Sequence, residues 1–183
     1  METLGQAIEP WHDFYTAISA AAATLVGLLF VSLSLNLKLV TGDEHAEIRA
    51  LAAQTFTNFI YVLIISLIFL IPNQSPSGVG IPFVIFGALG IASVTRAIMT
   101  TARKKEQVRR TMIQSWRFIA GRFILPLLAY LSLMVIAILL WSGDTKSLSW
   151  MLFVIFSLLG SAISVAWDLF LELGRGSVDE SGG

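Results

Sequence analysis

The chain has 183 residues, of which 56% are hydrophobic and only 13% are charged, and its mean hydropathy is +0.79. Soluble domains are about 45–50% apolar and about 25% charged, so this composition argues against a water-soluble enzyme and indicates a membrane protein of one domain. The 12 Lys and Arg balance the 12 Asp and Glu, so net charge gives no indication of a nucleic-acid partner. The absence of Cys excludes disulfides, thiolate metal sites and cysteine nucleophiles.

Uncharged segments give the number of membrane spans. A helix that crosses a hydrocarbon core of about 30 Å needs roughly 20 residues. The longest uncharged segment, 50–95, is divided by a run of turn-forming residues that ends at Pro82, and Pro82 fits the first turn of the next helix. We therefore predict an all-α bundle of five transmembrane helices, at about 17–40, 51–71, 82–101, 123–141 and 148–173.

The first predicted helix has a face of small residues. Ala20, Ala23 and Gly27 lie near one side of it, and small residues allow two helix backbones to approach closely. Tight packing inside the bundle or between subunits explains this face. The alternative is a narrow pore, to which Thr24, Ser32 and Asn36 would contribute polar lining.

The same helix carries a resemblance. Phe14 and Tyr15, followed by the run AAATLVGLLFVSLS at 21–34, resemble the opening helix of small, uncharacterised bacterial inner-membrane proteins. The resemblance covers this helix alone and contains no catalytic motif. It implies a multi-pass protein of the bacterial plasma membrane and implies no activity and no site residues.

The second helix begins with a recognisable cap and then carries polar residues. Thr41 and Glu44 fit a capping box, and the acidic residues around His45 suit the positive end of a helix dipole better than a metal site. Further along, Gln54 and Asn58 fall on one face, which must contact protein or water. Hydrogen bonding between helices explains this face, and the lining of a hydrated path is the alternative.

The connection at 102–122 is basic and amphipathic. Its apolar residues follow helical spacing, so we expect it to lie on the cytoplasmic leaflet and bind anionic lipid headgroups. Its lipid-facing cations are Arg103, Lys104, Lys105, Arg109, Arg110 and Arg117. If the N-terminus is outside, every Lys and Arg except Lys146 is cytoplasmic, so the positive-inside rule predicts N-out, C-in.

Charged residues also occur near the predicted cytoplasmic ends of three helices. Asp168 and Arg96 lie inside the predicted ends at 173 and 101, and Arg122 opens the fourth helix. A charge at mid-membrane costs at least about 2.5–3.5 kcal/mol, so we expect Asp168 to pair with Arg96 or Arg122. A structural bridge explains this layer, a gate or substrate-coordinating site is the alternative, and Arg96 alone could snorkel to the headgroups. One stripe of the fifth helix comprises Ser157, Ser161, Ser164, Asp168 and Glu172. Its serines are candidate polar lining of the pore, and its two carboxylates belong to the charge layer.

Catalytic signatures are missing from the sequence. There is no HExxH, GxSxG or P-loop pattern, and His12 and His45 are predicted on opposite sides of the membrane. We expect no catalytic residue, no metal and no cofactor, and a disordered tail at 174–183. The leading functional hypothesis is a homo-oligomeric, channel-like pore for ions or small solutes. The alternative is a non-conducting accessory or scaffold protein that binds a larger membrane partner.

Overall fold

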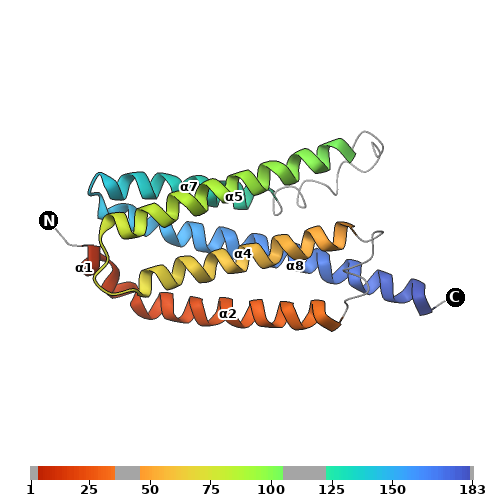
Figure 1. Cartoon of the computed structure of the whole chain (residues 1–183). Coiled ribbons are helices and arrows are strands. Elements are labelled where there is room, and N and C mark those ends of the chain that lie inside the picture. The colour runs from red at the N-terminus through yellow and green to blue at the C-terminus, as the bar shows by residue number, and fades with distance from the viewer. Residues whose placement is uncertain (1–3, 36–45, 105–122, 182–183) are drawn as a thin grey trace.

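The computed structural model describes residues 4–35, 46–104 and 123–181. Within these ranges the chain is helical apart from two short connections and forms no strand. The elements, in chain order, are α1 (Leu4–Ile8), the 3-10 helix η1 (Glu9–Trp11), α2 (His12–Leu35), α4 (Ala46–Leu70), α5 (Pro76–Lys104), α7 (Leu125–Trp141), the 3-10 helix η5 (Thr145–Trp150) and α8 (Met151–Ser181) (Figure 1).

The long helices have the length and composition of membrane spans. The 17-residue α7 is shorter but apolar along its length, and at 1.5 Å per residue it measures about 25 Å. Four helical segments of the described chain are long and apolar enough to cross a membrane: Leu4–Leu35, Ile48–Leu70, Pro76–Met99 and Lys146–Leu171. The predicted all-helical fold is confirmed, whereas four rather than five segments of the described chain have the length and composition of a membrane span.

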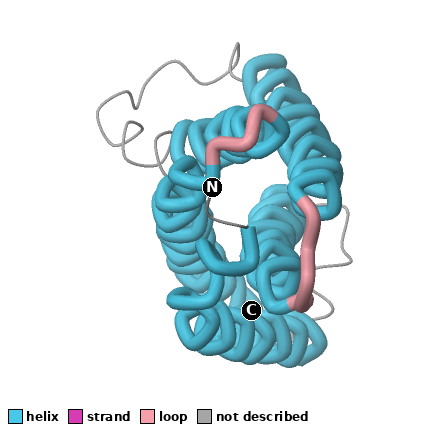
Figure 2. The backbone as a smooth tube through the Cα atoms, turned by 90° about the vertical axis from the view of Figure 1, so that its left-hand side faces the viewer, coloured by secondary structure: helices cyan, strands magenta, loops and turns pink. Residues whose placement is uncertain are grey.

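The helices pack in a definite lateral order. α5 lies against α7, α7 against α8, α8 against α4, and α4 against α2. Figure 1 shows the long helices side by side, and Figure 2 views them from the end that carries α1 and the two short connections. In this order α8 is in the middle, α2 and α5 lie at the two ends, and α4 is the main neighbour of α2.

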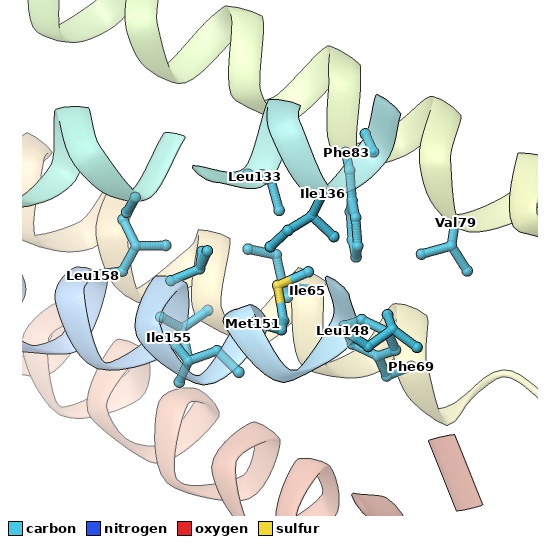
Figure 3. Packing of buried hydrophobic residues seen from close by; sticks show 14 of the residues in the cluster. Ile65, Phe69, Val79, Phe83, Leu133, Ile136, Leu148, Met151, Ile155 and Leu158 are labelled. Atoms are coloured by element: carbon cyan, nitrogen blue, oxygen red, sulfur yellow. The ribbon is translucent and has the colours of Figure 1, made fainter. Parts of the chain in front are cut away.

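Apolar side chains fill the centre of the bundle. Side chains from α4, α5, α7, η5 and α8 meet there: Ile65, Phe69, Val79, Phe83, Leu133, Ile136, Leu148, Met151, Ile155 and Leu158 (Figure 3). The Phe69 ring stacks on Tyr15 of α2, with ring centroids 4.4 Å apart, and contacts Phe83 of α5 at 5.5 Å. A smaller apolar cluster joins α4 and α8 near the other end, through residues such as Leu51 and Val165.

The start of α5 differs from the prediction. The helix begins at Pro76, and Pro82 lies inside it rather than in its first turn. The Ser75 Oγ accepts a hydrogen bond from the Gly78 N–H at 3.1 Å, so Ser75 caps the helix and Pro76 occupies the first position, where a missing N–H is harmless. The cap at Ser75 therefore decides where the helix starts.

The ends of other helices also differ from the prediction. α2 begins at His12, earlier than predicted, and α8 follows a 3-10 turn in which the Asp144 carboxylate accepts from the Lys146 N–H at 3.0 Å. α8 continues to Ser181, so most of the tail expected to be disordered is helical. α5 continues to Lys104, and the rest of the predicted basic connection, 105–122, lies outside the described residues.

Candidate functional site

A polar contact between three helices lies inside the apolar bundle. The Asn58 Nδ2 of α4 donates to the Ser161 Oγ of α8 at 3.0 Å, and the Tyr130 hydroxyl of α7 donates to the Asn58 Oδ1 at 3.2 Å. All three side chains are buried. One amide thus bridges two neighbouring helices, and we call Asn58, Tyr130 and Ser161 the buried polar cluster.

Glycines on α5 hold Tyr130 in place. A Cβ at Gly90 would lie only 2.5 Å from the Tyr130 ring, and one at Gly87 would lie 2.6 Å from the Met134 Cγ. The α5 backbone therefore approaches α7 more closely than any larger residue would allow. The Tyr61 ring, with its centroid 5.1 Å from that of Tyr130, provides a further contact.

Of the residues on α4 and α8 that are predicted to line a pore, some are buried inside the bundle and one is exposed on its surface. Asn58 and Ser161 meet in the cluster, Ser157 is buried, and Gln54 is half-buried. Ser164 instead faces outward and donates its hydroxyl to the Gly160 carbonyl of its own helix at 2.8 Å. The structure therefore does not gather these residues along one path through the bundle.

The small-residue face of α2 does not pack against this bundle. α2 buries Tyr15, Ser19 and Ala22 instead, and a Cβ at Gly27 would have no neighbour within 4 Å. Between Thr16 and Gly27 every exposed position of α2 holds a small or hydroxyl residue: Thr16, Ala17, Ala20, Ala21, Ala23, Thr24 and Gly27, here called the α2 outer face. Packing of Ala20, Ala23 and Gly27 inside one subunit is thus wrong, and packing between subunits stays a prediction.

Predicted lining residues of α2 occupy different environments. The Thr24 hydroxyl is exposed and donates to the Ala20 carbonyl at 2.9 Å, and Ser32 is half-buried. Asn36 lies outside the described residues.

The outward sides of the other helices carry bulky apolar residues. Examples are Ile81, Ile85 and Leu89 on α5, Leu131, Val135 and Ile138 on α7, and Phe153, Phe156 and Ile163 on α8. Such surfaces suit contact with lipid tails. The α2 outer face contrasts with them, because bulky exposed residues on α2 start only at Leu28.

Exposed tryptophans mark the depth of the predicted charge layer. Trp150 and Trp167 lie on the outside of η5 and α8, 17 residues or about 25 Å apart, close to the thickness of a hydrocarbon core. Trp favours the interface between membrane and water. Asp168 follows Trp167 directly and is half-buried, and α8 continues beyond it to Ser181.

Arg96 is one of the two predicted partners of Asp168. It is exposed on α5, which packs mainly against α7, and among the described residues no ion pair joins it to Asp168. Its exposure fits the alternative that its guanidinium reaches the headgroups alone. Arg122 lies outside the described residues, and Glu172 lies on α8 beyond Asp168. Arg103 and Lys104 end α5, whereas Lys105, Arg109, Arg110 and Arg117 are also outside the described ranges.

The described ranges contain no group of three or more His, Asp or Glu placed to hold a metal ion. At the α1 end the His12 Nδ1 lies 3.7 Å from the Asp13 carboxylate, and both residues are exposed. Comparison with protein-family models, curated proteins and solved structures found no match to this chain.

Sequence reasoning missed the part that Tyr130, Gly87 and Gly90 play. The signal was present, because Gly87 and Gly90 stand at helical spacing in an apolar segment and Tyr130 places a hydroxyl in another one. What the sequence lacks is the order of the helices, which brings α5 against α7.

Proposed function

We propose that this chain is the subunit of a homo-oligomeric membrane pore for ions or small solutes, assembled around the α2 outer face. In this arrangement α2 helices from several subunits surround the pore, and the remaining helices form its lipid-facing wall. The observation that carries the proposal is the contrast between the small and hydroxyl residues on α2 and the bulky outer surfaces of α5, α7 and α8.

Small residues at a membrane surface favour helix contact. They expose little apolar area to lipid, but they let a second helix approach until backbone atoms touch, as in small-xxx-small pairs. Ala23 and Gly27 form such a pair on the α2 outer face, where no part of the described chain covers Gly27.

The hydroxyls of this face support a pore rather than a purely apolar contact. Thr16 and Thr24 donate their hydroxyl hydrogens to the carbonyls of His12 and Ala20, both at 2.9 Å. Because the hydrogens are used within the helix, the oxygen lone pairs remain available to accept from water or to coordinate a cation. The apolar core of the bundle favours a path between subunits over one through a subunit (Figure 3).

We also propose an orientation, with the α1 end outside the cell. Arg49 and Arg96 lie near the opposite end of the bundle, at the start of α4 and toward the end of α5, whereas Lys146 lies at the α1 end. This separation follows the positive-inside rule and supports N-out, C-in in a bacterial plasma membrane.

Ion flux into proteoliposomes that contain only the purified protein tests the pore. We expect salt-dependent, saturable flux, and we expect Ala23→Leu to reduce it at least tenfold because the added side chain fills the narrow axis. The matched control is Ala88→Leu, which adds the same volume at an exposed position on α5 and should leave flux unchanged. Absence of flux from folded protein, or equal loss in both variants, would contradict the pore.

A non-conducting accessory protein is the second candidate. The α2 outer face would fit a helix of a larger membrane partner as well as it fits a second copy of this chain. This function predicts no flux, co-purification with another membrane protein, and loss of that partner in Ala23→Leu but not in Ala88→Leu.

A further inference from the structure

Two fully buried hydroxyls of α4, those of Thr55 and Ser66, make no hydrogen bond within the described residues. Several Ser and Thr of the long helices donate to a carbonyl of the preceding turn, among them Thr24, Thr57, Thr95 and Ser164. Thr55 is fully buried, and its Oγ1 makes no hydrogen bond within the described residues.

The backbone of α4 offers the Thr55 hydroxyl the same kind of hydrogen bond. Two residues further along α4, Thr57 donates to the Ala53 carbonyl at 2.7 Å, and the carbonyl of Leu51 stands in the same relation to Thr55. A buried hydroxyl without a partner destabilises the fold, and native proteins rarely retain one. Because Thr55 does not take this bond, its hydroxyl points to a partner outside the described residues.

The buried polar cluster lies one turn away. Thr55 and Asn58 are neighbours on one face of α4, and Asn58 contacts Ser161 across the interface with α8. An amide donates twice and accepts twice, whereas the described hydrogen bonds of Asn58 use one hydrogen and one lone pair. The site thus offers the Thr55 hydroxyl together with unused capacity on Asn58.

The absence of charge and the apolar surroundings of the site determine which kind of molecule can bind there. Thr55, Asn58 and Ser161 are all uncharged, and the positions beside them on the two helices are buried and apolar, for example Leu51, Val62, Leu158 and Ala162. A cation would have no counter-charge there, and a bulky solute would have to displace core side chains. A buried water needs only two to four polar partners.

We propose that a bound water molecule lies between α4 and α8, hydrogen-bonded to the Thr55 hydroxyl and to the Asn58 amide, and extends the buried polar cluster by one turn. The water completes the hydrogen bonding of α4 at its interface with α8. It is independent of the pore, because α2 contributes no residue to it.

Replacement of Thr55 by Val tests the water by the sign of its effect on stability. Val has nearly the shape of Thr without the hydroxyl, so removal of an unpartnered hydroxyl would raise the thermal midpoint, whereas removal of a partner of the water would lower it. We expect Thr55→Val to lower the midpoint by roughly 2–4 °C. The matched control is Thr57→Val, whose hydroxyl bonds within its own helix, and it should shift the midpoint by less.

A direct readout accompanies the stability measurement. Solid-state NMR of the protein in lipid should show magnetisation transfer from water to the Asn58 side-chain amide, and Thr55→Val should weaken this transfer while Thr57→Val preserves it. An unchanged or raised midpoint in Thr55→Val would overturn the proposal, and so would absence of transfer to Asn58 in the unaltered protein.

Discussion

Asn58 is the residue at which three helices of the bundle are linked by hydrogen bonds. Its amide accepts from Tyr130 of α7 and donates to Ser161 of α8, and it lies among apolar side chains of α4. Hydrogen bonds between membrane helices contribute about 0.6 kcal/mol on average and about 1.7 kcal/mol at most. Their geometry matters as much as their energy, because one rotation of α4 would break both bonds at once.

Removal of the Tyr130 hydroxyl tests this link. We expect Tyr130→Phe to lower the free energy of unfolding by about 1 kcal/mol, because the ring keeps its contacts while Asn58 Oδ1 loses its donor. Reversible unfolding in mixed micelles measures the change. Tyr61→Phe is the control, since Tyr61 contributes ring contacts but no hydrogen bond to the cluster, and an equal loss in that variant would contradict the role of Tyr130.

At the scale of elements, the pairing of α5 with α7 depends on glycine. Gly87 and Gly90 leave room for Met134 and Tyr130 against the α5 backbone, and this close contact carries the Tyr130 hydroxyl toward α4. Leu and Ile line the outer side of the same helix, so α5 separates a packing face from a lipid face.

A methyl group at Gly90 should break this pairing. Gly90→Ala places a Cβ 2.5 Å from the Tyr130 ring, and we expect it to reduce the unfolding free energy by about 1–3 kcal/mol as the helices move apart. Gly160→Ala is the matched control on α8, because its Cβ would meet only the Leu125 Cδ1 at 4.0 Å. The control should be neutral or slightly stabilising, and a loss of the same size there would show that Ala at any helical Gly has this effect.

The sequence predicts helices better than it predicts their ends and partners. Long uncharged segments require membrane helices, and the structure contains them. Pro82 does not locate the start of α5, because Ser75 and Pro76 provide the cap and the first-turn proline about one and a half turns earlier. Asn58 and Ser161 were identified separately as polar residues in apolar helices, whereas their contact depends on which helices are neighbours.

The same limit applies to two site predictions for which the sequence does not identify the partner helix. A small-residue face favours close helix contact but does not say with which helix, so Ala23 and Gly27 were expected inside a subunit or between subunits and are found on its outside. Arg96 and Asp168 have comparable predicted depths, but depth along a helix carries no information on lateral order, and α5 packs mainly against α7.

At the scale of the whole molecule, the apolar surface of the bundle carries bulky side chains on most helices and small side chains on α2. Bulky residues such as Ile85, Val135 and Phe156 cover most helices and suit lipid, whereas Ala23 and Gly27 belong to a face that suits another helix. Exposed tryptophans near both ends of the bundle fit a membrane between them. The central claim is therefore that the α2 outer face is an interface between subunits.

Disulfide cross-linking in native membranes tests that claim most directly. The chain has no Cys, so a single introduced thiol reports on one position alone. Oxidation of Ala23→Cys should give a product of twice the 20.0 kDa subunit mass, whereas Ala88→Cys, exposed on α5, should remain a monomer. If Ala23→Cys forms no dimer, or if both variants cross-link equally, the α2 outer face is not the interface between subunits. Either result would also contradict the proposed pore.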